Sequence, residues 1–147
     1  MTAAALGASA VLAAPAAGAI TVTSQDGERV ASFDSLSCKR TSKGALAAVG
    51  REGADKLRLL IRRYKGPGRY VVEYGFESDA NLLFKHGGDL SFVNFAEPQE
   101  ERLTDAGAFF VERTRKRTDI TVGVPIVYDS NGADAEWVRV IGEAACR

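Results

Sequence analysis

Arginine side chains that would share one face of a strand are the strongest candidates for binding chemistry in this chain. They occur in two segments, as Arg113, Arg115 and Arg117 in one and as Arg58 and Arg62 in the other. Alternate residues of a β-strand point to the same face, so the first three guanidinium groups would form one basic stripe. Guanidinium groups bind phosphate and carboxylate groups through paired N–H donors. The pattern therefore predicts a site for an anionic cell-wall polymer or for a protein partner.

The same arginines also have a purely structural interpretation. Natural sheets carry charge on edge strands, where it prevents pairing with another chain. The chain has 19 basic and 19 acidic residues, so its net charge does not draw it toward nucleic acid or anionic lipid. Aromatic residues are also too few beside the arginines to form a base-stacking platform. Because Glu100, Glu101 and Glu112 are close in sequence, edge protection is the interpretation that the sequence favours.

Catalytic groupings are hard to find in this sequence. His86 is the only histidine, and it precedes Gly87-Gly88 in a predicted turn. A nucleophilic triad needs a base beside Ser, Cys or Thr and an acid that orients the base. No Gly-x-Ser-x-Gly or Ser-x-x-Lys motif is present. We therefore interpret His86 as a solvent-facing turn residue, and a pair of carboxylates at hydrolase spacing is the enzymatic alternative that stays open.

The run Asp129–Glu136 has the oxygen-rich composition of a calcium-binding loop. Calcium binds several carboxylate and carbonyl oxygens on one tight turn. Here Gly132 lies one position too early for the helix–loop–helix calcium pattern, and the flanking segments are predicted strands. Asn131-Gly132 also favours a two-residue hairpin turn. We expect a polar hairpin tip and neither a bound metal nor another cofactor; a single histidine also excludes multi-histidine copper or zinc sites.

The first 19 residues, Met1–Ala19, resemble an export signal. They carry no charged side chain, are rich in Ala and end in the small-residue sequence Ala17-Gly18-Ala19. Export peptidases cut after such a sequence, so the mature chain is predicted to start at Ile20. A buried Ala-rich helix is the alternative, and Pro15 and the lack of a polar face count against it. The segment is too short and too rich in Ala for a membrane span.

Cys38 and Cys146 are the only cysteines. An even number of thiols in a chain bound for an oxidising compartment favours a disulfide. Leu36 shares a face with Cys38, and Val140 and Ala144 share a face with Cys146, so both sulfur atoms would point inward. A bridge closing a loop of about 100 residues stabilises the fold by at most about 4–5 kcal/mol. Two separate buried thiols are the alternative.

The clearest strand pattern lies between Lys56 and Phe76. Leu57, Leu59 and Ile61 alternate on one side of Gly66-Pro67-Gly68, and Tyr70, Val72, Tyr74 and Phe76 alternate on the other. This period of two is typical of half-buried strands. Because Gly-Pro-Gly is a turn sequence, the segment predicts a central β-hairpin.

Short strands recur between turn sequences over the rest of the chain. Thr41–Asp55 is rich in Gly and Ala and lacks clear alternation, so we predict a loop with one helical turn near Ala45–Val49. Pro125 interrupts the clean alternation of Ile120–Tyr128 and predicts an edge strand or a bulge. Together these signals predict an all-β domain over residues 20–147. We expect an antiparallel sandwich of seven to nine strands, immunoglobulin-like or related, with one disulfide.

Two patterns resemble a group of small secreted and lipid-anchored actinobacterial proteins, including the mycobacterial lipoprotein-antigen type. They are L-x-L-x-I-x-x-Y-x-G-P-G-x-Y from Leu57 to Tyr70 and V-R-V-x-G-x-x-x-C from Val138 to Cys146, and the export signal at Met1–Ala19 is the third feature of the resemblance. The resemblance implies an envelope-associated β-sandwich in which a disulfide joins an early strand to the last one, with no assigned reaction. The stripe Arg113–Arg117 has no counterpart in the group.

Taken together, the sequence predicts an exported, monomeric, non-catalytic binding module of the cell envelope or the extracellular space. Two alternatives belong to other classes. One is a small secreted hydrolase with a carboxylate pair. The other is a secreted inhibitor that presents an exposed loop such as Arg40–Arg51.

Overall fold

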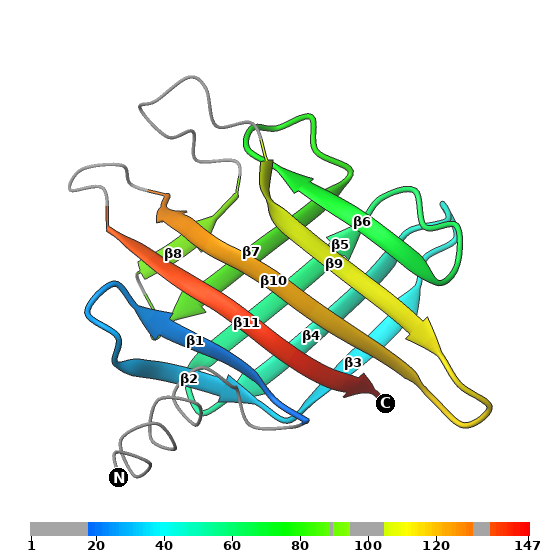
Figure 1. Cartoon of the computed structure of the whole chain (residues 1–147), viewed down its shortest axis with the longest axis horizontal. Helices are drawn as coiled ribbons and strands as arrows, with labels where there is room; N and C mark the ends of the chain where they lie inside the picture. Colours follow the sequence, from blue (N-terminus) through cyan, green and yellow to red (C-terminus); the bar gives the residue numbers. More distant parts are fainter. Residues whose placement is uncertain (1–17, 89, 95–104, 131–135) are drawn as a thin grey trace, which may run out of the picture.

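The computed structural model of the protein describes residues 18–88, 90–94, 105–130 and 136–147 (Figure 1). These residues form eleven β-strands. The strands are β1 (Ile20–Ser24), β2 (Arg29–Phe33), β3 (Ser35–Arg40), β4 (Leu46–Glu52), β5 (Asp55–Ile61), β6 (Gly68–Glu73), β7 (Ala80–His86), β8 (Leu90–Val93), β9 (Asp105–Arg113), β10 (Thr118–Asp129) and β11 (Trp137–Cys146). The described residues include no helix long and apolar enough to cross a membrane.

Eight of the strands close into a barrel in the order β11, β3, β4, β5, β7, β6, β9, β10 and back to β11. Six of the eight pairings are antiparallel, and the pairings β3–β11 and β6–β7 are parallel. Strands β1 and β2 extend the sheet beyond β11, and β8 pairs with both β7 and β10. Figure 1 shows β6, β9, β10 and β11 crossing over β3, β4, β5 and β7.

The all-β class is confirmed, whereas the predicted sandwich is not: the sheet closes, and it has more strands than the seven to nine expected. Alternation identifies which face of a strand is buried, but it does not identify the neighbouring strand. Closure depends on the two parallel pairings, and neither leaves a local signal in the sequence.

The predicted central hairpin is wrong in its pairing, although its strands exist. Strand β5 pairs with β4 and β7, and β6 pairs with β9 and β7. The link between β5 and β6 is held by other segments, because the Arg62 N–H donates to the Asp79 carbonyl at 2.7 Å and the Tyr64 N–H donates to the Gly44 carbonyl at 3.1 Å. The turn sequence therefore leads the chain across the barrel end instead of folding β6 back onto β5.

The predicted loop over Thr41–Asp55 is also wrong, because most of it is strand β4 and the turn into β5. Leu46, Ala48 and Gly50 point inward at alternate positions. Small residues on both faces hide this alternation from a hydrophobicity pattern. Gly50 has a packing reason, since a Cβ there would lie 2.9 Å from the ring of Phe33 on β2.

Large apolar side chains fill the core, including Leu57, Leu59 and Ile61, as predicted. The Phe84 ring lies in its centre, 6.2 Å from the Phe33 ring and 6.1 Å from the Phe92 ring between centroids. Such aromatic pairs add to the free energy of burial. The barrel interior is therefore a packed core, and its ends and outer surface are the places for a ligand.

The bulge predicted at Pro125 is confirmed. The register between β10 and β11 shifts between Val124 and Val127, so Val127 rather than Ile126 points into the core. The predicted disulfide between Cys38 and Cys146 is also confirmed, with the two Cα atoms 5.4 Å apart. Residues 1–17 of the predicted leader lie outside the described residues, and β1 begins at Ile20.

Candidate functional site

A basic pocket of about 440 Å³ lies at one end of the barrel. Strands β3, β9 and β11 end there, and β4, β6 and β10 begin there. Seven cationic residues line it: Lys39, Arg40, Arg113, Arg115, Lys116, Arg117 and Arg147. We call these seven residues the basic mouth. None of the described residues that line the pocket is acidic.

The turn between β9 and β10 brings four of these cations together. The Thr114 N–H donates to the Arg117 carbonyl at 2.9 Å, and the Arg117 N–H donates to the Thr114 hydroxyl at 3.3 Å. Arg113 therefore ends β9, and Arg115 lies in the turn. The predicted stripe on a single strand face is wrong in form, because the strand stops at Arg113. The turn nevertheless places all three arginines at one pocket.

The other three cations of the mouth are close to the disulfide in the sequence. Lys39 and Arg40 directly follow Cys38, and Arg147 directly follows Cys146. The bridge between the two cysteines forms part of the pocket wall. Our sequence interpretation missed these three cations, although the predicted disulfide was a signal that they lie close together.

Tyr64 is the aromatic residue of the pocket wall, and Tyr70 packs against it. The Arg40 guanidinium carbon lies 4.8 Å from the centre of the Tyr64 ring, and this ring lies 5.7 Å from that of Tyr70. Burial raises the pKa of the Tyr64 hydroxyl, and Tyr70 acts in the same direction, while Arg40 and Arg113 act against them. Tyr64 therefore keeps its proton at neutral pH and is a hydrogen-bond donor rather than a competing anion.

One carboxylate engages a cation of the mouth from outside the lining. The Arg117 Nε atom lies 3.0 Å from Asp119 Oδ1. Within the described part of the chain, the side-chain partner of Arg113 is a neutral group, the Thr118 hydroxyl, to which its Nη1 donates at 3.4 Å. None of the described carboxylates forms an ion pair with the other six cations of the mouth. The pocket is thus a region of positive charge that is not neutralised by its own wall.

Arg58 and Arg62, the other two predicted binding residues, do not reach this pocket. They line a separate hollow of about 210 Å³ on the outside of the barrel, beside Leu60 and Phe76. The Phe76 side chain is 72% exposed. The structure thus divides the five predicted arginines between two places.

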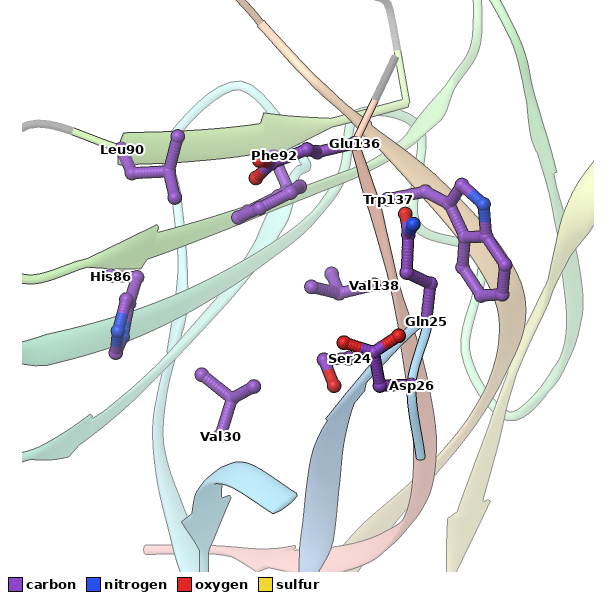
Figure 2. Close-up of a pocket in the computed structure, with 10 residues that line it drawn as sticks. All are labelled: Ser24, Gln25, Asp26, Val30, His86, Leu90, Phe92, Glu136, Trp137 and Val138. Atoms are coloured by element: carbon purple, nitrogen blue, oxygen red, sulfur yellow. The ribbon is translucent and has the colours of Figure 1, made fainter. Parts of the chain in front are cut away.

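Figure 2 shows another pocket of about 240 Å³, between β1, β8 and β11. His86 lines it, and its Nδ1 atom lies 3.0 Å from Asp55 Oδ1. Ser24 lines the same pocket, but Figure 2 shows His86 and Ser24 apart, with the Val30 side chain between them in this view. The Ser24 hydroxyl oxygen accepts a hydrogen bond from the Glu28 N–H at 3.2 Å. These residues therefore do not form a nucleophilic triad.

The carboxylates of Asp26 and Glu136 also line this pocket. They do not point toward each other in Figure 2, and both residues are exposed. A general acid in a hydrolase needs an environment that raises its pKa, and exposure to solvent does not supply it. Of the run Asp129–Glu136, residues 131–135 lie outside the described residues. Within the described part of the chain, no three His, Cys, Asp or Glu residues are grouped to hold a metal ion.

Comparison with protein-family models, with curated proteins and with solved structures finds no match to this chain. The functional interpretation therefore depends on the geometry and charge of its own residues.

Proposed function

We propose that this protein is an exported, non-catalytic binding module whose basic mouth binds an anionic polymer of the cell envelope. One observation carries the proposal: seven cations converge on a single pocket that none of the described acidic residues lines. Like charges held close together repel one another, so this arrangement is most favourable when an anion lies among them. The ends of β-barrels are common sites for ligands.

Edge protection, which the sequence favours for Arg113–Arg117, does not account for these charges. Strand β9 pairs with β6 and β10, and β10 pairs with β9 and β11. Both strands therefore have a partner on each side, and neither offers the unpaired edge that charge would protect. The arginines gather at the barrel end, where a ligand can reach them.

The chemistry of the mouth favours a partner with several negative groups. Arginine binds phosphate and carboxylate in a bidentate manner, and lysine acts as a point charge for the same groups. Among the described residues, Tyr64 is the one aromatic residue that lines the pocket. Single-stranded nucleic acid is normally bound on a series of aromatic side chains. A wall polymer with repeated phosphate or carboxylate groups is the partner that we propose.

Binding of fluorescent inorganic polyphosphate, followed by anisotropy over a series of salt concentrations, tests the proposal. In the mouth variant, Arg113→Gln with Arg115→Gln, we expect affinity to fall about 10- to 100-fold, since a charge-assisted hydrogen bond is worth about tenfold. The slope of log K against log salt should become shallower by about 1.4, which is about 0.7 for each phosphate group that the variant no longer neutralises.

The matched control, which we call the distal variant, is Arg29→Gln with Arg139→Gln, because it removes the same charge from β2 and β11. It should bind as the unmodified protein does. Equal binding by the mouth variant and the unmodified protein would overturn the proposal, and so would an equal loss of affinity in the two variants. Neutral glucan should bind to none of the three proteins.

Export is the second part of the proposal, and it is supported by the predicted leader and by the disulfide. Intact mass of the secreted product under non-reducing conditions tests both. We expect a mature chain that starts at Ile20 and has lost two hydrogen atoms at the cysteines. A full-length product with two free thiols, recovered only from cell extract, would contradict export.

A further inference from the structure

The outer surface of four neighbouring barrel strands is cationic over its whole width. Leu57, Leu59 and Ile61 of β5 point into the core, so the residues between them point outward, and the same alternation holds in β3, β4 and β7. The outward residues are Ser35, Ser37, Lys39, Ala47, Val49, Arg51, Lys56, Arg58, Leu60, Asn81, Leu83 and Lys85. We call this surface, together with Arg62 at the end of β5, the cationic face. It carries six cations and, among the residues described, no acid.

Three acidic residues that border these strands are engaged elsewhere. Glu52 pairs with Arg29 on β2 at 3.5 Å and accepts a hydrogen bond from the Ser32 N–H. The Asp55 carboxylate accepts a hydrogen bond from the Gly87 N–H at 2.9 Å, and His86 lies beside it. None of the described carboxylates forms an ion pair with a cation of the face.

The third bordering acid has its own partner as well. The Asp79 carboxylate binds the Arg63 guanidinium through two of its nitrogen atoms, the closest at 2.9 Å. Asp34, which directly precedes β3, is exposed and forms no ion pair with a cation of the face. The six cations of the face therefore have no acidic partner among the described residues, and the partner that the face fits is an anion.

The cationic face is continuous with the basic mouth. A shallow groove of about 580 Å³ runs over β3 and β4, and Lys39 and Arg147 line both this groove and the pocket of the mouth. Arg51 lies in the same groove and faces Lys56 across the β4–β5 pair. Beyond it, Arg58 and Arg62 line the hollow beside Phe76. Cations thus recur from the mouth, over the barrel rim, to β5.

We propose that the basic mouth and the cationic face form one track for a linear polyanion. The proposal depends on the function proposed above and extends it to the class of ligand, an extended chain with a phosphate, sulfate or carboxylate group in each repeat. The face alone is about 14 Å wide from β3 to β7, which is three spacings of about 4.8 Å. A ligand that uses the whole track must therefore be several repeats longer than one that fills the mouth.

A flat lipid surface fits this geometry less well. The track turns from the side of the barrel into the pocket at its end, so a planar bilayer that lies on the face does not fill the mouth. A flexible polymer follows such a bend at a small cost in free energy. Apolar side chains between the cations, such as Val49, Leu60 and Leu83, leave room for the polymer backbone.

Inorganic polyphosphates of defined length test the track. The face variant is Arg58→Gln with Arg62→Gln, which removes as much charge as the mouth and distal variants do. For the unmodified protein we expect affinity to rise with chain length well beyond the length that saturates the mouth. The face variant should keep the short-chain affinity and lose the gain from length, which makes it about tenfold weaker for long chains. The mouth variant should be weak for both lengths.

Three outcomes would overturn the track and leave the proposed function intact. The first is long-chain binding by the face variant equal to that of the unmodified protein. The second is an equal loss of affinity for short and long chains in the face variant. The third is sedimentation with anionic vesicles that depends on Arg58 and Arg62 and not on Arg113 and Arg115, which would assign the face to lipid. Absence of binding by the unmodified protein at every length would instead refute the proposed function itself. Unchanged thermal unfolding of each variant shows that the fold is kept.

Discussion

Gly142 in strand β11 is fixed by the backbone of β1. Its φ is +141°, and a Cβ there would lie 2.8 Å from the Cα atom of Ile20, the first residue of β1. We expect Gly142→Ala to lower the free energy of unfolding by about 3 kcal/mol or more, since backbone strain and a steric clash add together. Urea unfolding followed by Trp137 fluorescence measures this change.

Gly27 provides the matched control for that substitution. Its φ is +89°, but no atom lies within 4 Å of a Cβ built there. Gly27→Ala therefore adds only the conformational cost of a left-handed alanine, about 1–2 kcal/mol. Equal destabilisation of the two variants would show that the close approach of Gly142 to Ile20 has no energetic weight.

Sequence patterns predicted single residues well wherever a strand was regular. The inward side of Leu57–Ile61 was predicted correctly, because it depends only on local alternation. The cysteine pair was also predicted correctly, because the chain has only two cysteines and both lie on inward strand faces. Phe76 was expected to share the buried face of Val72, and it is 72% exposed instead. Strand β6 ends at Glu73, so the alternation that relates these two residues does not extend to Phe76. Residue patterns fail where an element stops.

At the scale of elements, the parallel pair β6–β7 is the weakest join in the barrel, with a single residue pair, Val72 and Ala80. Asn94, which is 0% exposed, bridges the join. Its Oδ1 accepts from the Leu82 N–H at 2.9 Å, and its Nδ2 donates to the Glu73 carbonyl at 2.7 Å. The Asn94 side chain thus replaces part of the hydrogen-bond ladder that β6 and β7 lack.

We expect Asn94→Ala to lower the free energy of unfolding by on the order of 3 kcal/mol, because the buried Leu82 N–H loses its acceptor and the Glu73 carbonyl loses its donor. Hydrogen exchange should accelerate at the Leu82 amide more than at the Ala48 amide in the core of β4. Asn81→Ala is the milder comparison, since that residue is only partly buried. A uniform acceleration across the barrel would contradict a local role for Asn94.

The other parallel join, β3–β11, has two residue pairs and carries the disulfide. Replacing both cysteines by alanine removes a link between residues 108 positions apart. We expect a loss of stability that approaches, and does not exceed, about 4–5 kcal/mol. Lys39, Arg40 and Arg147 would also lose their fixed positions, so polyphosphate affinity should fall even in the fraction that stays folded. Affinity unchanged in the folded double variant would argue against a structured mouth.

Elements were predicted less well than residues, for a physical reason. Turn sequences such as Gly66-Pro67-Gly68 define where the chain bends, and strand pairing is decided by which apolar faces meet in the core. Strand β5 meets β4 and β7, so the expected central hairpin does not form. In the same way, the turn at Thr114–Arg117 moved the arginine stripe from a strand face to the barrel end.

For the whole molecule, the distribution of charge carries information that the net charge hides. The chain has equal numbers of acidic and basic residues, so its net charge gives no reason to expect attraction to a polyanion. Folding gathers seven cations at the mouth and six on the cationic face, with Lys39 common to both. Long-range electrostatic steering follows such local fields rather than the sum of charges.

Retention on a sulfonate cation exchanger at pH 7 distinguishes the effect of net charge from the effect of the local distribution of charge. In about 0.01 M salt the Debye screening length is about 30 Å, and we expect the protein to be retained despite its zero formal charge. We expect it to elute near 0.15 M salt, where the screening length is about 8 Å. The mouth and distal variants each lower the formal charge by two, so net charge alone predicts the same earlier elution for both. A charge field concentrated at the mouth predicts early elution of the mouth variant and nearly unchanged retention of the distal variant. Identical elution of the two variants would show that the resin responds to net charge, and that the clustering of cations has no effect at longer range.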